Sequence, residues 1–237
     1  MMAPETPENR RPIKSRSSGW ATQTARALAA AGISANAISV ASVGFALAAA
    51  VALILAPVLG FWLYLVAALL CPLRLLANLF DGMVAVEHGK ATHTGPLYNE
   101  VPDRISDVVV IAALGYSASM SAHGSVASGV MLGFIGEWAH LVGWLGAVAA
   151  LLTAYVRELG RALGGPADFS GPLAKQQRMW VTVVAALSAF VLGIFVSPAL
   201  ASIALFGGSV VIAVGTALTV VRRLNRLAAF LRSAAER

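Results

Sequence analysis

Cysteine is almost absent from this chain, since Cys71 is the only one among 237 residues. One cysteine cannot form a disulfide within a chain, and it cannot supply a metal site built from several thiolates. Cys71 also lies inside an apolar run. These facts exclude a disulfide framework within the chain and a cysteine metal centre.

Charge is scarce as well. Charged residues make up 12% of the chain, against about a quarter in a typical soluble domain. Hydrophobic residues make up 58%, and the mean hydropathy is +0.78. Apolar runs of about 20 residues span the hydrocarbon core of a bilayer. The composition predicts an all-α, polytopic membrane protein. A soluble bundle of buried helices is the alternative, and it would need far less apolar sequence.

Six apolar segments have the length of membrane-spanning helices. Ser34 or Asn36 is expected to cap the first of them, and residues 20–31 are expected to form a short helix at the membrane surface. Residues 1–18 are polar and Pro-rich, which predicts disorder. The predicted spans cover residues 37–55, 61–86, 96–119, 138–163, 179–196 and 200–221. The predicted division is an N-terminal cytoplasmic segment 1–33, a six-helix membrane domain 34–225 and a basic C-terminal tail 226–237.

Lysine and arginine are missing from three of the five connections between these spans. All seventeen flank the termini or the connections after the second and fourth spans. The positive-inside rule then places both termini in the cytoplasm, in a protein of the cell's inner (cytoplasmic) membrane. The net charge is +6, but the basic residues adjoin apolar runs, which favours a membrane over nucleic acid as the partner.

The few acidic residues of the chain are concentrated in one stretch. The segment 78–107, between apolar runs, holds five of the eleven acidic residues. Asn78 and Asp81 are three residues apart, and Asn99, Asp103 and Asp107 follow at intervals of four. Such spacings place side chains on one face of a helix. Because the second and third spans are antiparallel neighbours, the two polar stripes are expected to face each other at the cytoplasmic end.

Oxygen-bearing ligands of this kind suit a hard divalent cation. Ionisable residues inside spans are costly and are usually functional. The structural alternative is a set of ion pairs with Arg74 and Arg104, and it suits Glu100 and Asp107 best. Small residues beyond Asp81 would let a ligand or a second backbone come close.

The stretch resembles the signature of the CDP-alcohol phosphatidyltransferases, D-x2-D-G-x2-A-R-x8-G-x3-D-x3-D. The spacing is kept throughout, and a six-span chain with this motif at the second and third spans also looks like that family. Asn78 and Asn99 stand at the first and third Asp positions, and Val86 stands where the family has Arg. The matching residues are Asp81, Gly82, Ala85, Gly95 and Asp103.

The resemblance implies a phosphatidyl transfer from a CDP-linked lipid such as CDP-diacylglycerol to an alcohol, with release of CMP. It implies Mg2+ or Mn2+ held by Asn78, Asp81, Asn99 and Asp103, with Asp103 also as the catalytic base. Glu100 and Asp107 are candidates for additional acidic ligands. The small residues Gly82, Ala85 and Gly95 would adjoin the CDP group. A homodimer is also implied.

A second basic set lies on the motif's side of the membrane, around the fourth and fifth spans. It would bind the acceptor or a phosphate, and ordinary positive-inside charge is the alternative. Its members are Arg157, Arg161, Lys175 and Arg178.

Two other functions compete with the enzyme. A cation-binding transporter would carry its polar site near the membrane midplane between repeats, whereas this motif falls at one end of two adjacent helices. A non-catalytic relative would bind CDP-lipid without turnover.

Overall fold

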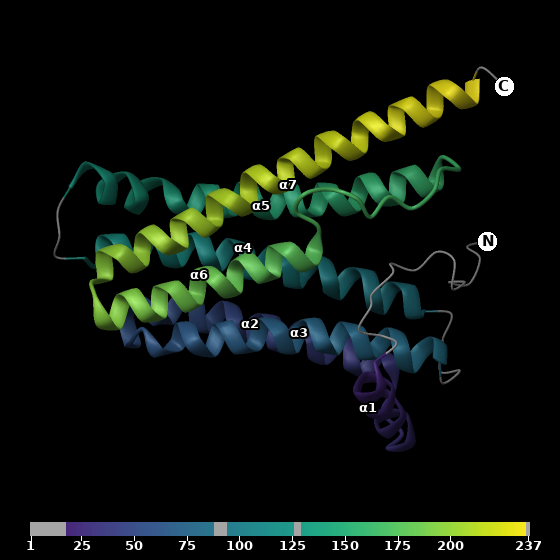
Figure 1. The fold of residues 1–237 in the computed structure, drawn as a ribbon, viewed down its shortest axis with the longest axis horizontal. Helices are drawn as coiled ribbons and strands as arrows, with labels where there is room; N and C mark the ends of the chain where they lie inside the picture. Colours follow the sequence, from purple (N-terminus) through teal and green to yellow (C-terminus); the bar gives the residue numbers. More distant parts are fainter. Residues whose placement is uncertain (1–17, 88–93, 126–128, 236–237) are drawn as a thin grey trace.

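The computed structural model describes residues 18–87, 94–125 and 129–235. Over these ranges it is all-helical, and six of its helices are long and apolar enough to span a membrane (Figure 1). The prediction of an all-α, multi-pass membrane protein with six spans is therefore confirmed. The predicted disordered segment 1–18 lies outside the described ranges except for its last residue. The helices are α1 Gly19–Ala30, α2 Ala35–Leu59, α3 Trp62–Glu87, α4 Gly95–His123, α5 Val130–Ala162, α6 Lys175–Phe195 and α7 Pro198–Ala235.

Helix α2 begins where the sequence predicts and ends slightly later. The Ser34 hydroxyl accepts a hydrogen bond from the Ala37 backbone N–H over 3.1 Å, which confirms Ser34 as the cap. The sequence predicts a tight turn after this span, with Pro57 and Gly60 as its breakers. The part about Pro57 is wrong, because α2 continues through Pro57 to Leu59, with Gly60 as the C-cap. Proline leaves the carbonyl four residues earlier without its helical donor. Here Ser117 Oγ of α4 donates to that carbonyl, Leu53 O, over 2.6 Å, so the backbone group stays satisfied inside the bundle.

Helices α5 and α7 extend furthest beyond their predicted spans. Helix α5 begins at Val130 rather than 138, because its first turns pack inward through Ile135 and Gly136 although Glu137 lowers their hydropathy. Helix α7 has 38 residues and no break at residue 226, so it is about 57 Å long against about 30 Å of hydrocarbon.

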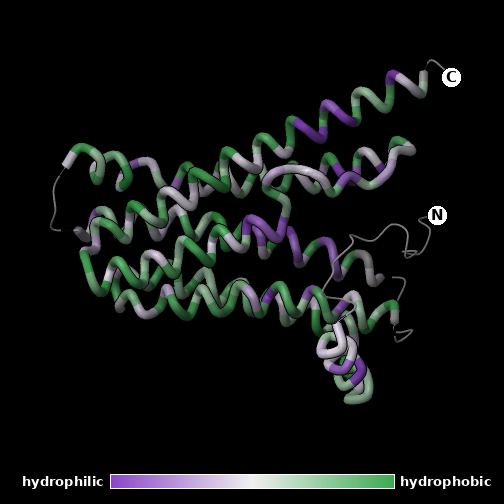
Figure 2. Tube along the Cα trace, in the orientation of Figure 1, coloured by the Kyte–Doolittle hydropathy of each residue, from purple (hydrophilic) through white to green (hydrophobic). Residues whose placement is uncertain are grey.

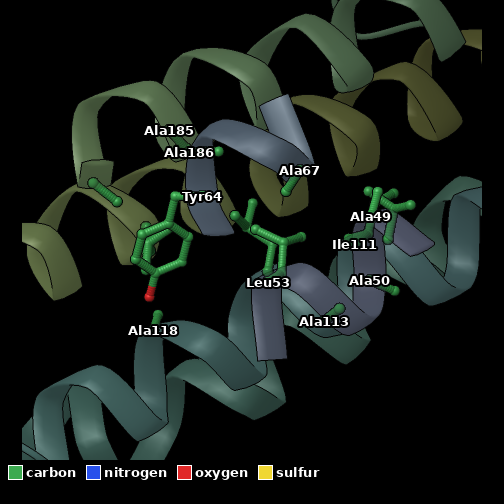
Figure 3. Close-up of a cluster of buried hydrophobic side chains, with 14 of the residues drawn as sticks. Ala49, Ala50, Leu53, Tyr64, Ala67, Ile111, Ala113, Ala118, Ala185 and Ala186 are labelled. Atoms are coloured by element: carbon green, nitrogen blue, oxygen red, sulfur yellow. The ribbon is translucent and has the colours of Figure 1, made fainter. Parts of the chain in front are cut away.

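Small residues let the spans approach closely. A Cβ atom added to Gly115 of α4 would lie 2.6 Å from Gly143 Cα of α5, so the two backbones touch at this point. Alanine predominates in the buried core, with Leu53, Tyr64 and Ile111 among the larger side chains (Figure 3). Dense packing of this kind holds the polar ends of α3, α4, α5 and α6 in fixed positions.

Helix α1 lies crosswise to the bundle and packs against α3 (Figure 1). Ala21 and Ala25 are fully buried, and the Trp20 ring meets Phe80 edge to face with centroids 6.0 Å apart. Hydrophilic residues are concentrated toward the end of the bundle where α1 lies, on the adjoining turns of α4, α5 and α7 (Figure 2). The site described below lies at that end.

Candidate metal and phosphate site

One cavity of about 510 Å3 opens at the polar end, between α3, α4, α5 and α6. The structure brings the two motif halves and the second basic set together around it. The polar residues that line it include Asn78, Asp81, Asn99, Glu100, Asp103, Arg104, Arg157, Arg161, Lys175, Arg178 and Arg223. The roles of these residues stay predictions, but their juxtaposition is a property of the fold.

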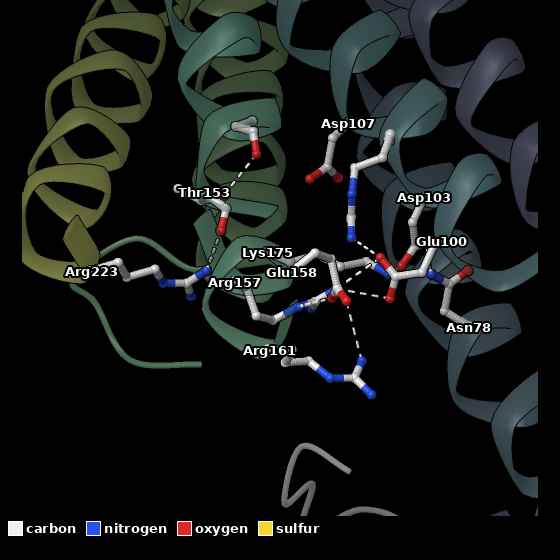
Figure 4. A network of polar contacts seen from close by, with 12 residues as sticks. Asn78, Glu100, Asp103, Asp107, Thr153, Arg157, Glu158, Arg161, Lys175 and Arg223 are labelled. Atoms are coloured by element: carbon white, nitrogen blue, oxygen red, sulfur yellow. Dashed lines mark hydrogen bonds and ion pairs between the residues drawn. The ribbon is translucent and has the colours of Figure 1, made fainter. Parts of the chain in front are cut away.

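The Asp103 carboxylate of α4 lies at the cavity wall, close to Asn78 and Lys175 (Figure 4). Asn78 Nδ2 of α3 donates to Asp103 Oδ1, and Lys175 Nζ of α6 donates to Asp103 Oδ2. Arg74 Nη2 lies 3.6 Å from Oδ1 and donates to the Asp103 backbone carbonyl over 3.2 Å. Two neighbouring helices, α3 and α6, therefore hold this carboxylate at the cavity wall, where 9% of the residue is exposed.

The carbonyl oxygen of Asn78 is buried and has no hydrogen-bond partner. An unsatisfied buried acceptor is costly, and a cation would relieve that cost. Among the residues that the structure describes, no three His, Cys, Asp or Glu side chains group as a metal centre. A cation at this place would therefore depend on carboxamide oxygens as well as on Asp81 and Asp103, and the cavity contains both kinds of group.

Asp81 of α3 is buried, with 4% exposure, yet it lines the cavity. Ser39 Oγ of α2 donates to Asp81 Oδ2 over 2.6 Å. Ser39 is itself buried, so it orients the carboxylate from the side away from solvent.

Asp107 lies one helical turn deeper than Asp103 and does not line the cavity. Its carboxylate stands between two arginines, with Arg178 Nη2 at 2.6 Å and Arg74 Nη2 at 2.9 Å. All three side chains are at most 3% exposed. This geometry favours the ion-pair interpretation of Asp107 over a metal-ligand role.

Glu100 lines the cavity but is also held by arginines (Figure 4). Arg157 Nη2 donates to both Glu100 oxygens, over 2.8 and 2.7 Å, and Arg104 Nη2 donates to Oε2. Arg157 Nε donates to Glu158 over 2.8 Å, and Arg161 Nη1 donates to the other Glu158 oxygen over 3.3 Å. The second basic set thus adjoins acidic partners within the cavity wall.

The loop between α5 and α6 closes one side of the cavity through Phe169, whose ring centroid lies 5.3 Å from the Arg157 guanidinium carbon. Arg223 Nε of α7 donates to Ser170 O over 2.9 Å. Gly171 has φ +134°, and a Cβ atom there would lie 2.2 Å from Thr219 Cγ2, so only glycine fits.

Asp168 fixes the middle of the same loop. Its carboxylate accepts the Ser170 N–H over 2.8 Å and lies 3.6 Å from Arg226 Nη1. Burial alone would raise the pKa of Asp168, but the Ser170 hydrogen bonds and the charges of Arg223 and Arg226 outweigh burial and lower it.

The three small residues predicted beside CDP occupy different places. Gly82 lines the cavity, whereas Ala85 packs against the apolar cluster beneath α1. Gly95 forms the first turn of α4, next to the N-cap Thr94. The cavity therefore offers Gly82 as the close-approach position.

Several residues of the site carry no signal in the motif. Ser39 and Arg74 could still have been found from the sequence, because they are polar residues inside apolar spans. Such residues usually face the interior of a bundle. Phe169 and Arg223 reach the cavity only through the fold of the loop and of α7.

No protein-family model and no curated protein sequence matches this chain. Solved structures do. The phosphatidylinositol phosphate synthase of Mycobacterium tuberculosis, in complex with manganese and citrate, superposes with a TM-score of 0.66 at 21% identity, over 87% of this chain and 88% of that one. The same enzyme with CDP-DAG bound gives a TM-score of 0.64 at 20% identity, over 87% and 92%. The chain therefore has the fold of these membrane enzymes.

Proposed function

We propose that this protein is a CDP-alcohol phosphatidyltransferase. It transfers the phosphatidyl group of a CDP-linked lipid such as CDP-diacylglycerol to an alcohol and releases CMP. The observation that carries the proposal is the convergence of Asn78, Asp81, Asn99 and Asp103 on one cavity. These four positions keep the family's spacing, and the fold is that of a solved enzyme with CDP-DAG bound.

A divalent cation, Mg2+ or Mn2+, fits the oxygen donors of the cavity. Asp81 and Asp103 supply charged oxygens, and Asn78 and Asn99 supply neutral ones; the solved enzyme was crystallised with manganese. When bound, such a cation would supply positive charge that neutralises and orients the diphosphate. The orphaned Asn78 carbonyl oxygen supports this assignment. Glu100 and Asp107 are proposed to hold arginines rather than the cation.

Asp103 acts as the catalytic base in this proposal. The acceptor hydroxyl gives its proton to the Asp103 carboxylate, and its oxygen forms a bond to the lipid-side phosphorus. The bond between that phosphorus and the oxygen of CMP breaks, and CMP leaves with the electron pair. Arg74 and Asn78 fix the carboxylate during this step, since both contact it from α3.

The remaining cavity residues bind and orient the substrates. Lys175 and Arg178 stand beside Asp103 and Asp107 and would face the substrate phosphates, whereas Arg157 and Arg161 lie toward the acceptor. Gly82 leaves room for the CDP group, and the apolar outer faces of the spans accommodate the acyl chains in the bilayer.

The test is CMP release by purified protein supplied with labelled CDP-diacylglycerol, Mg2+ or Mn2+ and a panel of alcohols. Turnover that needs both the cation and an alcohol supports the proposal. Binding of CDP-lipid without any CMP release would instead identify a non-catalytic relative, which the two asparagines at Asp positions make the second candidate.

We further propose that the cavity faces the cytoplasm from the inner membrane, in a homodimer. The distribution of lysine and arginine supports this orientation. Reporter fusions after residue 237 and within residues 120–135 should report opposite sides of the membrane, and light scattering in detergent should give the mass of two chains.

A further inference from the structure

Five charged side chains form an alternating row along one wall of the cavity, which we call the charge ladder. In order they are Arg161, Glu158, Arg157, Glu100 and Arg104. All of these contacts are within 3.3 Å, and all members except Glu158 line the cavity. The ladder joins α5 to α4 through Arg157 and Glu100, which are 57 residues apart in sequence.

Two of the three guanidinium nitrogens of Arg157, Nε and Nη2, are already engaged in this ladder. A guanidinium binds a phosphate in a bidentate way through the Nε–Nη2 edge or the Nη1–Nη2 edge. Nη2 donates to both oxygens of Glu100, and Nε donates to Glu158. Both edges therefore meet a carboxylate before any substrate arrives.

The charges of the ladder nearly cancel. Its three guanidinium groups and two carboxylates leave one net positive charge. A phosphate monoester carries about 1.5 to 2 negative charges at neutral pH, and it would stand against Glu100 and Glu158. An alcohol without net charge meets no such repulsion, and it can hydrogen-bond to both kinds of group.

The other basic residues lie elsewhere. Arg178 is 3% exposed and bound to Asp107, and Lys175 contacts Asp103, where the lipid diphosphate is proposed to lie. Arg223 donates to the backbone carbonyls of Ser170 and Thr153. None of these three residues therefore adds positive charge to the ladder.

We propose that the acceptor is an alcohol of zero net charge and not a phosphorylated alcohol. A polyol or a zwitterionic hydroxy amino acid would meet this condition. This inference rests on the proposed phosphatidyl transfer and names the acceptor class of that site. Glu100 and Glu158 are the residues that set the class, because they neutralise the arginines that a phosphate would need.

The experiment compares CMP release with glycerol, inositol and serine against glycerol 3-phosphate and inositol phosphate. The wild-type protein should have a higher kcat/KM for at least one unphosphorylated acceptor than for either phosphorylated one. Glu100→Gln should raise the ratio for phosphorylated acceptors at least about tenfold, since one repelling charge is removed. Glu158→Gln provides the same test if the first variant fails to fold. Glu137→Gln, at the far end of α5, is the matched control and should leave the ratio unchanged.

Calorimetry gives a second readout that does not need turnover. Glycerol 3-phosphate should show no saturable binding to the wild-type protein below about 10 mM, and binding should appear in Glu100→Gln. A wild-type protein that binds it tightly, or that prefers a phosphorylated acceptor, overturns the inference. Absence of CMP release with every alcohol would contradict the proposed function instead, and the calorimetric comparison would still decide the chemistry of the ladder.

Discussion

Ser39 Oγ donates a hydrogen bond to Asp81 Oδ2 over 2.6 Å, across 42 residues of sequence. The contact ties α2 to the motif on α3, so the first span takes part in the site although it carries none of the motif. Both side chains are at most 4% exposed, so water does not compete for the bond.

Replacing Ser39 by alanine should therefore weaken cation binding without removing a ligand. Loss of a hydrogen bond that orients a ligand typically costs about 10-fold or more in metal affinity or activity. We expect Ser39→Ala to raise the Mg2+ concentration needed for half-maximal CMP release by about that factor. Ser209→Ala is the control, because Ser209 is equally buried but bonds only to its own helix. Equal effects from both variants would show a general packing defect.

Changing Asp103 to asparagine should affect turnover and binding differently from changing Asp81 to asparagine. Asp103→Asn removes the proposed base and should lower kcat by about 100-fold or more, while CDP-lipid binding is partly retained. Asp81→Asn removes a charged ligand and should weaken cation dependence and CDP-lipid binding together. Turnover and equilibrium binding of labelled CDP-lipid separate the two effects. Near-normal turnover of Asp103→Asn would exclude it as the base.

Asn99→Asp should tighten cation binding. Asn99 lines the cavity, and a carboxylate there would add a charged oxygen donor. The competing carboxylates, Glu100 and Asp107, are bound to arginines, so neither is expected to occupy the same coordination position. A Mn2+ titration followed by electron paramagnetic resonance measures the affinity directly. Asn99→Ala is the comparison variant and should bind more weakly than the wild type.

Asp107→Asn should lower stability rather than cation affinity. The change leaves Arg74 and Arg178 buried without their shared counter-charge, and breaking a buried pair costs about 3 to 5 kcal/mol. Thermal unfolding in detergent measures this, with Glu137→Gln as an exposed control. A normal unfolding temperature with reduced Mn2+ affinity would mean that Asp107 is a ligand after all.

The loop between α5 and α6 should loosen in acid. The pKa of Asp168 is lowered on folding, so its contribution is complete above its unfolded pKa of about 4 and is lost as pH falls through the folded value. Hydrogen-exchange protection of residues 163–174 should therefore be higher in the wild type than in Asp168→Asn at neutral pH. The difference should shrink below about pH 4. A difference that does not change with pH would show that the ionised carboxylate of Asp168 is not what holds the loop.

Most of the fold could be predicted from the apolar runs. The ends of α5 and α7 could not, because hydropathy reports where a helix leaves the bilayer and not where it stops. Arg222 and Arg223 mark that border in α7, yet the helix continues because Leu227 and Phe230 approach Gly160 and Gly165 at the end of α5. The continuation of α2 through Pro57 could not be predicted for a similar reason, since Ser117, which satisfies the freed carbonyl of Leu53, lies 64 residues away from it.

Spacing along the chain predicted which motif residues share a helix face, and the cavity contains all four candidate ligands. It could not predict which charges neutralise one another. Glu100 and Asp107 are acidic residues spaced like the candidate metal ligands. Only the positions of Arg157 on α5 and of Arg178 on α6 show that the two carboxylates bind arginines instead. Pairings between helices depend on the three-dimensional arrangement, which one-dimensional periodicity does not contain.

The pairing of Asp107 has a consequence for biosynthesis. Its two counter-ions come from helices made at different times: Arg74 belongs to α3, and Arg178 belongs to α6. Arg74 is already synthesised when α4 emerges from the ribosome. The Asp107 carboxylate can therefore enter the membrane paired with Arg74 rather than alone. Arg178 is synthesised two helices later, in α6. Arg178 then binds Asp107 from α6, at a position where Arg74 already balances the carboxylate.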